Sequence, residues 1–300
     1  MKLTPNKTAP LGAIVEDVDL KSISDEQLVA IIDALARHGV LCFRDQILTD
    51  AQHVAFTSRI GTLSVNVASK GMTGDTPEIM IISNIVKDGK PIGLGDAGQD
   101  WHTDMSYSQV PGHATGLYAI EVPHDDGQPL GDTEFASMYL AYETLPEDIR
   151  TRIDGLYAVR DFAKLWNHMI KKGSPRPPLT PEQRRERPPV IHPLVMRHPV
   201  SGRKALYADP GLTVAIVGQS RAESDALLDM LFSHQIDRKF VYTHKWRLHD
   251  FILWDNIATI HRAVGGLKPH QHRHMRRTQI SLDVTKHAGF SYTDNNAVYL

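Results

Sequence analysis

Apolar residues recur at intervals of three and four positions in several segments, and this spacing predicts amphipathic helices. The clearest helix begins after Ser24, which forms a capping-box pattern with Gln27, and it ends at Gly39. Thr49 and Gln52 repeat the pattern and predict a second helix, with a stop at residue 61.

Two further helices follow from the same spacing. One is expected from Ala136 to Leu145, where Pro146 ends it. The other begins at Ser220, which makes a capping-box pattern with Glu223 ahead of a leucine-rich face.

The remaining apolar runs are short and lie between turn residues, which predicts β-strands. We expect strands at residues 40–44, 79–83, 115–122, 131–135, 191–197, 204–208, 239–243, 250–254, 258–262 and 276–284. Ser201 and Gly202, between two of these runs, predict a hairpin turn. Because the strands do not alternate with helices, a parallel α/β sheet is disfavoured. The pattern favours a mainly β protein with flanking helices, built as a sandwich or jelly roll.

Residues 171–189 differ from the rest of the chain. They contain six prolines and four arginines, a composition that cannot pair into a sheet. One interpretation is a solvated surface insertion. The other is a lid over a pocket, whose basic groups attract an anionic substrate. We place this lid or insertion at residues 161–190 of a single domain that spans residues 1–300.

Composition narrows the possible functions. The chain has 300 residues, of which 41% are apolar and 23% charged, and its formal net charge is −2. These values are ordinary for a globular protein and do not indicate binding to nucleic acid or a membrane. The first ten residues contain no apolar core of a signal peptide, so we expect none. Cys42 is the single cysteine; we expect it to be buried and unreactive, and the protein to be cytoplasmic.

Sixteen histidines justify a search for a metal site. In an extended segment, His102 and Asp104 point to the same side, so an imidazole and a carboxylate meet at one point. His261 is a lone histidine on a predicted strand, and alone it is typical of a buried core histidine. Together the three residues predict a facial triad that leaves three positions open on an octahedral iron(II).

Arginines on the last predicted strand suggest a partner for this metal. Arg273 and Arg277 share a face if the strand is regular, and an arginine fork holds a carboxylate through two hydrogen bonds. When 2-oxoglutarate chelates iron through its 2-oxo acid end, its distal carboxylate needs such a group. Thr133 can add a hydroxyl hydrogen bond, although a threonine after a turn is also ordinary strand structure.

Four separated motifs together carry a resemblance to a known family. They are Trp101-His102-Thr103-Asp104, Gly131-Asp132-Thr133-Glu134-Phe135, Trp254-Asp255-Asn256 followed by His261-Arg262, and Met275-Arg276-Arg277-Thr278. In order and spacing they resemble the taurine dioxygenase and 2,4-dichlorophenoxyacetate dioxygenase (TauD/TfdA) family. The resemblance covers nearly the whole chain.

The resemblance implies a double-stranded β-helix, which is a jelly-roll core with helices outside. It implies Fe(II), 2-oxoglutarate and O2 as cofactor and co-substrates, with succinate and CO2 as products. His102, Asp104 and His261 are then the iron ligands, and Arg277 with Thr133 binds the distal carboxylate of 2-oxoglutarate. Arg273 matches a second arginine that faces the substrate or co-substrate.

The substrate expected from the resemblance is a small organic anion. Taurine-specific members have a histidine where this chain has Ser64, whereas Tyr242, His244 and Trp246 are similar to the phenoxyacetate branch. This favours a carboxylate such as an aryloxyalkanoate, which is hydroxylated and thereby cleaved if the carbon bears an ether oxygen. Lys70 is a candidate partner of this anion, with a solvated lysine as the alternative. Family members suggest a homo-oligomer, either a dimer or a tetramer.

Other functions remain open at this point. A zinc or manganese hydrolase, or a cupin-like isomerase, can use the same three ligands. A jelly-roll binding protein without activity is a second alternative, which the complete ligand set disfavours. His270, His272 and His274 form either an adventitious metal site or a solvated turn.

Overall fold

The computed structural model describes residues 1–65, 76–174 and 177–282. Lys70, Arg176 and the predicted strand positions 283–284 lie outside the described residues. None of the helices within the described ranges is long and apolar enough to cross a lipid bilayer.

A seven-stranded sheet forms one layer of the molecule, with strand order β1-β2-β3-β17-β7-β19-β4. Its strands are Lys2–Pro5 (β1), Ala13–Glu16 (β2), Val40–Phe43 (β3), Met80–Ser83 (β4), Gly112–Glu121 (β7), Phe251–Asp255 (β17) and His274–Ser281 (β19). All neighbours are antiparallel except β2 and β3. Five of the predicted strands are therefore confirmed, while β1 and β2 were not predicted.

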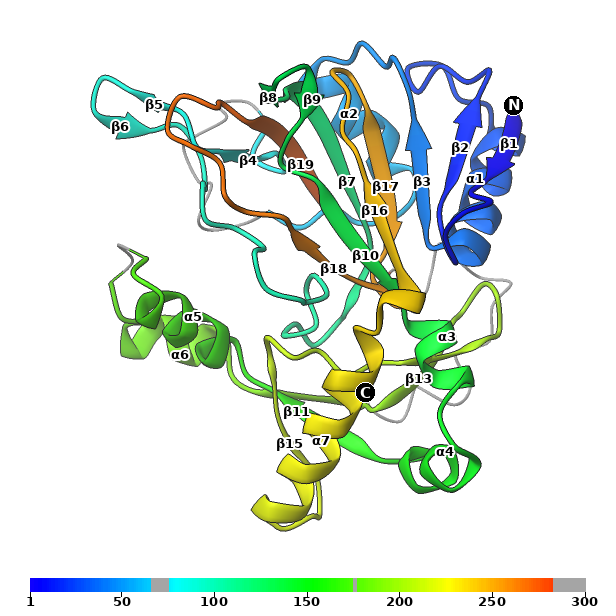
Figure 1. The fold of residues 1–300 in the computed structure, drawn as a ribbon, viewed down its shortest axis with the longest axis vertical. Helices are drawn as coiled ribbons and strands as arrows, with labels where there is room; N and C mark the ends of the chain where they lie inside the picture. The colour runs from blue at the N-terminus through cyan, green and yellow to red at the C-terminus, as the bar shows by residue number, and fades with distance from the viewer. Residues whose placement is uncertain (66–75, 175–176, 283–300) are drawn as a thin grey trace.

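A three-stranded antiparallel sheet, β16-β10-β18, lies against this layer (Figure 1). Its strands are Thr133–Ser137 (β10), Val241–His244 (β16) and Thr259–Ala263 (β18). Phe135 on β10 packs with Trp254 on β17 and Met275 on β19 in one buried apolar cluster. The two sheets thus face each other across a shared core, as alternating apolar residues on both require.

The remaining strands form a second, smaller β region and three hairpins. They are Tyr157–Arg160 (β11), Val190–Pro193 (β12) and Thr213–Ile216 (β15) in one sheet, and Val195–Arg197 (β13) with Lys204–Leu206 (β14), Val86–Lys87 (β5) with Lys90–Pro91 (β6), and His124–Asp125 (β8) with Gln128–Pro129 (β9). The predicted strand 191–197 is two strands in different sheets, because the chain changes partner at Leu194. The predicted turn between β13 and β14 is confirmed, and Gly202 has the positive φ of 69° that this turn requires.

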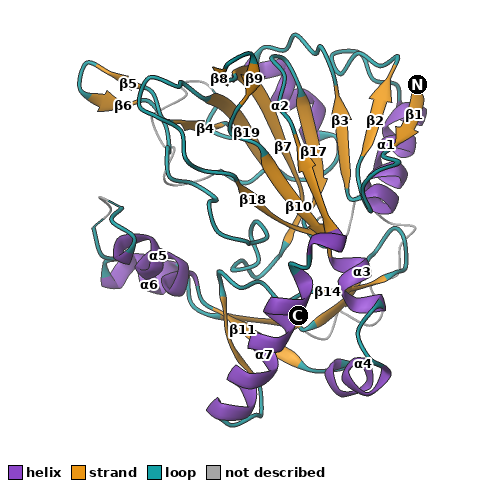
Figure 2. Cartoon of the chain, in the orientation of Figure 1, coloured by secondary structure: helices purple, strands orange, loops and turns teal. Residues whose placement is uncertain are grey.

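Seven α-helices of the described residues flank the strands (Figure 2). They are Asp25–His38 (α1), Asp50–Ser58 (α2), Met138–Glu143 (α3), Glu147–Ile153 (α4), Phe162–Lys171 (α5), Pro181–Glu186 (α6) and Arg221–Gln235 (α7), with a 3-10 turn at Arg238–Phe240. The capping boxes predicted at the start of α1, α2 and α7 are present. The mainly β class with flanking helices is therefore confirmed.

Two predicted helix boundaries were wrong. The second helix ends at Ser58 rather than at Gly61, because Arg59 and Ile60 already bond to Phe56 and Thr57 in tighter turns. The third begins at Met138 rather than at Ala136, which still pairs with β18 as part of β10.

The proline-rich segment contains no strand in its described part, as predicted. Instead it includes the short helix α6, which Thr180 caps and in which Pro181 occupies the first turn. Together with α5, it forms a separate helical layer that lies away from α1 and α2 (Figure 1). Helix α5 was not predicted, although Asp161 caps it by accepting a hydrogen bond from the Ala163 N–H.

Candidate metal and co-substrate site

Two backbone hydrogen bonds place His102 beside His261. The His102 N–H donates to the His261 carbonyl at 3.0 Å, and the His261 N–H donates back at 2.8 Å. A pair joined in this way presents both side chains to the same face. The two imidazole rings consequently lie with their centroids 4.2 Å apart.

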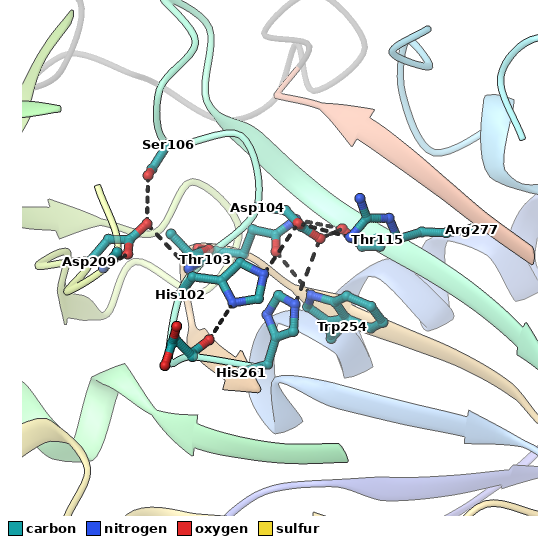
Figure 3. Close-up of polar contacts among 12 residues, drawn as sticks. His102, Thr103, Asp104, Ser106, Thr115, Asp209, Trp254, His261 and Arg277 are labelled. Atoms are coloured by element: carbon teal, nitrogen blue, oxygen red, sulfur yellow. Dashed lines mark hydrogen bonds and ion pairs between the residues drawn. The ribbon is translucent and has the colours of Figure 1, made fainter. Parts of the chain in front are cut away.

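Asp104 completes the cluster from the turn that follows His102 (Figure 3). Its carboxylate oxygens lie 3.8 Å from His102 Nε2 and 3.9 Å from His261 Nε2. The three residues each offer one ligand atom, and these atoms lie within 4.8 Å of one another. The expected triad is thus brought together, although Asp104 lies in a turn rather than in a continuous strand.

The turn that carries two of these residues is held by buried polar contacts (Figure 3). The Asp209 carboxylate accepts from the Ser106 hydroxyl at 2.8 Å and from the Thr103 N–H at 3.4 Å. The Thr103 hydroxyl donates to the Asn256 carbonyl at 2.6 Å. These contacts fix the segment against the strand pair that carries His261, so the relative placement of the two histidines is rigid.

The surroundings of Asp104 keep its carboxylate ionised. Burial alone raises its pKa, but the Arg277 guanidinium, the two imidazoles and the Thr115 hydroxyl outweigh burial and bring the pKa well below its usual range. Thr115 donates to one carboxylate oxygen at 2.8 Å, and Arg277 Nη1 lies 3.3 Å from the other. An anionic oxygen is therefore available to a metal at neutral pH.

Each histidine can offer one ring nitrogen to a metal. His102 Nδ1 lies 2.8 Å from the Asp100 carbonyl, which can only accept, so Nδ1 carries a proton and Nε2 is the nitrogen that faces the triad. Burial, with the neighbouring His102 and Arg277, holds the pKa of His261 well below its usual value despite the opposing effect of Asp104. Two imidazoles and one carboxylate form the donor set of a non-haem iron site.

The two predicted arginines have different contacts. Arg277 is on β19 and contacts Asp104 as well as the Met80 sulfur, at 2.9 Å from Nη2. Arg273 precedes β19, with its guanidinium carbon 6.0 Å from the centre of the Trp246 ring. Trp246 Nε1 donates to the Thr133 hydroxyl at 3.0 Å. These contacts connect Thr133 through Trp246 to Arg273, whereas the family resemblance implied that Thr133 acts together with Arg277.

Arg273 is a buried cation whose surroundings, as far as the structure describes them, contain no anionic partner. Its exposed fraction is 9%, no carboxylate of the described residues pairs with it, and its Nε has no hydrogen-bond partner there. Burial lowers the pKa of Arg273 from 12.5 to about 10. Such a group points to a missing anionic ligand, because an isolated buried charge is unfavourable.

A cavity of about 610 Å³ adjoins the triad. Its first wall is formed by the triad segment with Met80, Arg277 and Gln279, and its second by α5 and α6. Phe162, Leu165, Trp166 and Met169 lie along the cavity side of α5, at the spacing of one helical face. The segment expected to be a lid or a surface insertion is therefore a wall of this cavity.

Asp100 connects α5 to the triad segment. Its carboxylate accepts from Lys172 Nζ at 2.6 Å and lies 3.1 Å from His168 Nε2, both at the end of α5. Its carbonyl orients His102. Neither Asp100 nor α5 was predicted to have a role. The signal in the sequence was the helical spacing of the apolar positions 162, 165, 166 and 169.

Two other histidine clusters are internal networks. Asp255 contacts His198 at 2.7 Å and caps the backbone of Ile257 and Ala258, while His113 lies 4.0 Å away. The second network joins His244 and Arg44 to Asp250 beside Cys42, whose burial raises the pKa of its thiol to about 12. Cys42 is thus buried, as predicted.

The predicted histidine cluster at residues 270, 272 and 274 does not come together as a metal site within the described part of the chain. His272 and His270 are exposed, and His272 Nδ1 lies 3.7 Å from the Glu121 carboxylate. The solvated turn is the interpretation that agrees with these positions.

Comparison with known proteins adds independent information. The sequence model of the family described as "Taurine catabolism dioxygenase TauD, TfdA family" matches residues 2–279. The alpha-ketoglutarate-dependent 2,4-dichlorophenoxyacetate dioxygenase of Cupriavidus pinatubonensis is 34% identical over 280 residues, covering 88% of this chain and 92% of that protein. The pentalenolactone F synthase of Streptomyces avermitilis is 31% identical over 297 residues, covering 94% and 95%. A crystal structure of AAD-2 in complex with Mn(II) and N-oxalylglycine is similar with a TM-score of 0.76 and 27% identity, covering 94% and 98%.

Proposed function

Because this chain belongs to the TauD, TfdA family, we propose that His102, Asp104 and His261 bind the Fe(II) with which a 2-oxoglutarate-dependent dioxygenase works. The enzyme class itself follows from the family and from its dioxygenase relatives. The observation that carries the ligand assignment is the triad itself, with two imidazoles and an ionised carboxylate at one wall of a cavity. No fourth histidine, cysteine or carboxylate joins this cluster among the described residues, which suits a metal with open coordination positions.

We assign the distal carboxylate of 2-oxoglutarate to Arg273 and Thr133. Arg273 is buried beside Trp246 and lacks an anionic partner in the described structure, which is the environment a bound carboxylate would complete. Thr133 accepts from Trp246, and its own hydroxyl proton remains free to donate. Arg277 already contacts Asp104, so its role is to keep that ligand ionised at the cavity wall.

In this proposal the residues around the site have separate roles in the reaction. Fe(II), 2-oxoglutarate and O2 supply the oxidising chemistry, which yields succinate, CO2 and a hydroxylated substrate. The Asp100 carbonyl keeps the proton of His102 on Nδ1, so that Nε2 faces the triad. Thr115 and Arg277 hold the Asp104 carboxylate in place. The apolar side of α5 reduces access of water to the cavity.

We further propose that the seven-stranded and three-stranded sheets form the double-stranded β-helix of this family, and that the protein is cytoplasmic. The shared core of the two sheets and the buried thiol of Cys42 support these proposals. The substrate is a small organic anion, for which the aryloxyalkanoate-type relative is a precedent. A hydrolase or isomerase with the same metal ligands does not bind 2-oxoglutarate, so it would supply no distal carboxylate to pair with the buried Arg273.

The test is succinate formation from 2-oxoglutarate in air with added Fe(II), across a panel of carboxylates, sulfonates and sulfate esters. We expect succinate formation to be stimulated by a carboxylate and to disappear in His261→Ala. Turnover of a substrate that needs neither O2 nor 2-oxoglutarate would contradict the dioxygenase assignment and favour a hydrolase or isomerase.

A further inference from the structure

Arg187 is a cation in the cavity that has no carboxylate partner among the described residues. It follows α6, is half-buried and lines the cavity. The two other cationic side chains that line the described cavity are paired, Lys172 with Asp100 and Arg277 with Asp104. Arg187 makes no ion pair or hydrogen bond with any described residue, and its exposed neighbour Glu186 does not pair with it.

Aromatic rings hold the guanidinium of Arg187 in one orientation. Its carbon lies 4.6 Å from the centre of the Phe162 ring and 5.7 Å from the centre of the Tyr107 ring. Stacking on aromatic faces occupies the flat sides of a guanidinium and leaves its N–H edge available. That edge matches the two oxygens of a carboxylate, so a planar anion can bind with two parallel hydrogen bonds.

Tyr107 connects this cation to the triad. Its side chain lines the cavity, and its hydroxyl has no hydrogen-bond partner among the described residues. Burial raises the pKa of Tyr107, and the charges of Arg187, Asp104 and Arg277 all act on it. The phenol therefore stays protonated at neutral pH. It can donate a hydrogen bond to an anion that lies between Arg187 and the cavity wall formed by the triad segment.

The rest of the cavity wall is apolar. Phe162, Leu165, Trp166 and Met169 on α5 are only half-buried, so they offer apolar surface to a ligand. A ligand that fits both the Arg187–Tyr107 pair and this apolar face has an apolar, ring-sized body and one carboxylate.

We propose that Arg187 and Tyr107 bind the carboxylate of the substrate and that the α5 wall selects its apolar body. This assignment rests on the proposed function and names the group that would determine its specificity. Within the arginine-rich segment, Arg187 then differs from Arg184 and Arg185, which are exposed and do not line the cavity.

The test compares acids with uncharged analogues of the same shape. Protein loaded with Fe(II) and 2-oxoglutarate without O2 is titrated with 2,4-dichlorophenoxyacetate, indole-3-acetate and phenylacetate and with their primary amides, and dissociation constants are measured by calorimetry. We expect the wild-type protein to prefer acids over amides. Arg187→Gln should weaken acid binding roughly 10- to 100-fold and amide binding less than threefold, as expected for loss of a hydrogen-bonded charge.

Two further variants separate the contribution of the Tyr107 hydroxyl from that of net charge. Tyr107→Phe keeps the aromatic ring and removes one donor, so we expect a loss of acid affinity of roughly 3- to 10-fold. Arg184→Gln changes the same net charge at an exposed position of α6 and should leave both affinities unchanged. Thermal unfolding of each variant establishes that it is folded.

The results distinguish failure of the proposed function from failure of the Arg187 assignment. Failure of the wild-type protein to bind 2-oxoglutarate would count against the proposed function. With 2-oxoglutarate binding intact, three results would each overturn the assignment of Arg187: no preference for acids across the panel, equal loss of acid and amide binding, or an Arg184→Gln effect as large as that of Arg187→Gln.

Discussion

Replacing Arg273 by methionine should stabilise the ligand-free protein and at the same time abolish tight binding of 2-oxoglutarate. The guanidinium is buried next to Trp246, without an anionic partner in the described structure. Methionine has a similar length and no charge, so it can fill the space without a large cavity. The substitution therefore separates the unfavourable burial of a cation from its use in binding.

The structure gives a magnitude for the first effect. The fall of the Arg273 pKa from 12.5 to about 10 corresponds to a penalty of about 3 kcal/mol for the charged form. Because the pKa of the folded state still lies well above 7, the side chain stays charged at neutral pH and the whole penalty is present. Repacking around methionine costs about 1 kcal/mol, so the free energy of unfolding should rise by about 2 kcal/mol.

The second effect has the opposite sign. Without Arg273, the distal carboxylate of bound 2-oxoglutarate would be buried with only the Thr133 hydroxyl as a partner. Removing one member of a buried charge pair costs about 2–5 kcal/mol, which corresponds to a loss of affinity of roughly 30- to 5,000-fold. Binding of Fe(II) should change little, because no triad residue contacts Arg273.

The assay measures both quantities on the same variants. Urea unfolding of ligand-free protein gives stability, and anaerobic calorimetric titration of the Fe(II) form gives the affinity for 2-oxoglutarate. Arg276→Met is the matched control, since Arg276 lies three positions further along, on β19, but pairs with Asp50 at a partly exposed position. It should lose at most about 1 kcal/mol of stability and bind 2-oxoglutarate normally.

Lower stability of Arg273→Met together with unchanged 2-oxoglutarate affinity would refute the reasoning. A large loss of 2-oxoglutarate affinity in Arg277→Met, with normal affinity in Arg273→Met, would instead restore the pairing of Arg277 with Thr133 that the sequence had suggested.

Two further predictions concern the α5 wall and the behaviour in acid. Asp100→Asn removes the anion that holds Lys172 and His168 but keeps the carbonyl that orients His102, so we expect a two- to fivefold rise in the KM for substrate without loss of Fe(II) affinity; weaker iron binding would contradict this. Burial lowers the pKa of His53 to about 3 and that of His192 to about 4, whereas the unfolded chain binds these protons near 6.5. The unfolded state thus binds more protons, and the free energy of unfolding should fall as the pH drops from 6.5 toward 4, by about 2 kcal/mol for each histidine at pH 5. Urea unfolding at pH 7.5 and 5.0 measures this loss, which should be smaller in His53→Gln; equal losses in the two proteins would contradict the assignment.

The elements that the sequence predicts well are those set by local chemistry. The capping boxes of α1, α2 and α7 require only residues three positions apart, and all three are present. The triad could also be anticipated, because the short spacing of His102 and Asp104 limits how far apart they can lie. What the sequence lacked was the backbone pairing of His102 with His261, which joins positions 159 residues apart.

The partners of the arginines could not be read from strand alternation. The alternation itself holds, because Arg276 pairs with Asp50 on one side of β19 while Met275 packs in the buried cluster on the other. The register against β7 shifts between His274 and Met275, but the extra residue is Ile120 on β7, so the two-residue period of β19 is kept. What alternation does not give is the partner of each side chain, since Arg273 lies by Trp246 and Arg277 by Asp104.

The apolar side of α5 shows a different limit. Its periodicity predicts that one face of the helix is covered, but not whether protein or ligand covers it. The charges around the cavity indicate that a ligand covers this face. Of the four cations in or beside the described site, Lys172 and Arg277 have protein carboxylates as partners, while Arg187 and Arg273 do not. The proposed reaction brings two organic anions to the site, 2-oxoglutarate and an acidic substrate. Each unpaired arginine is then matched by one reactant, and the two can be tested separately because no described contact joins Arg187 to Arg273.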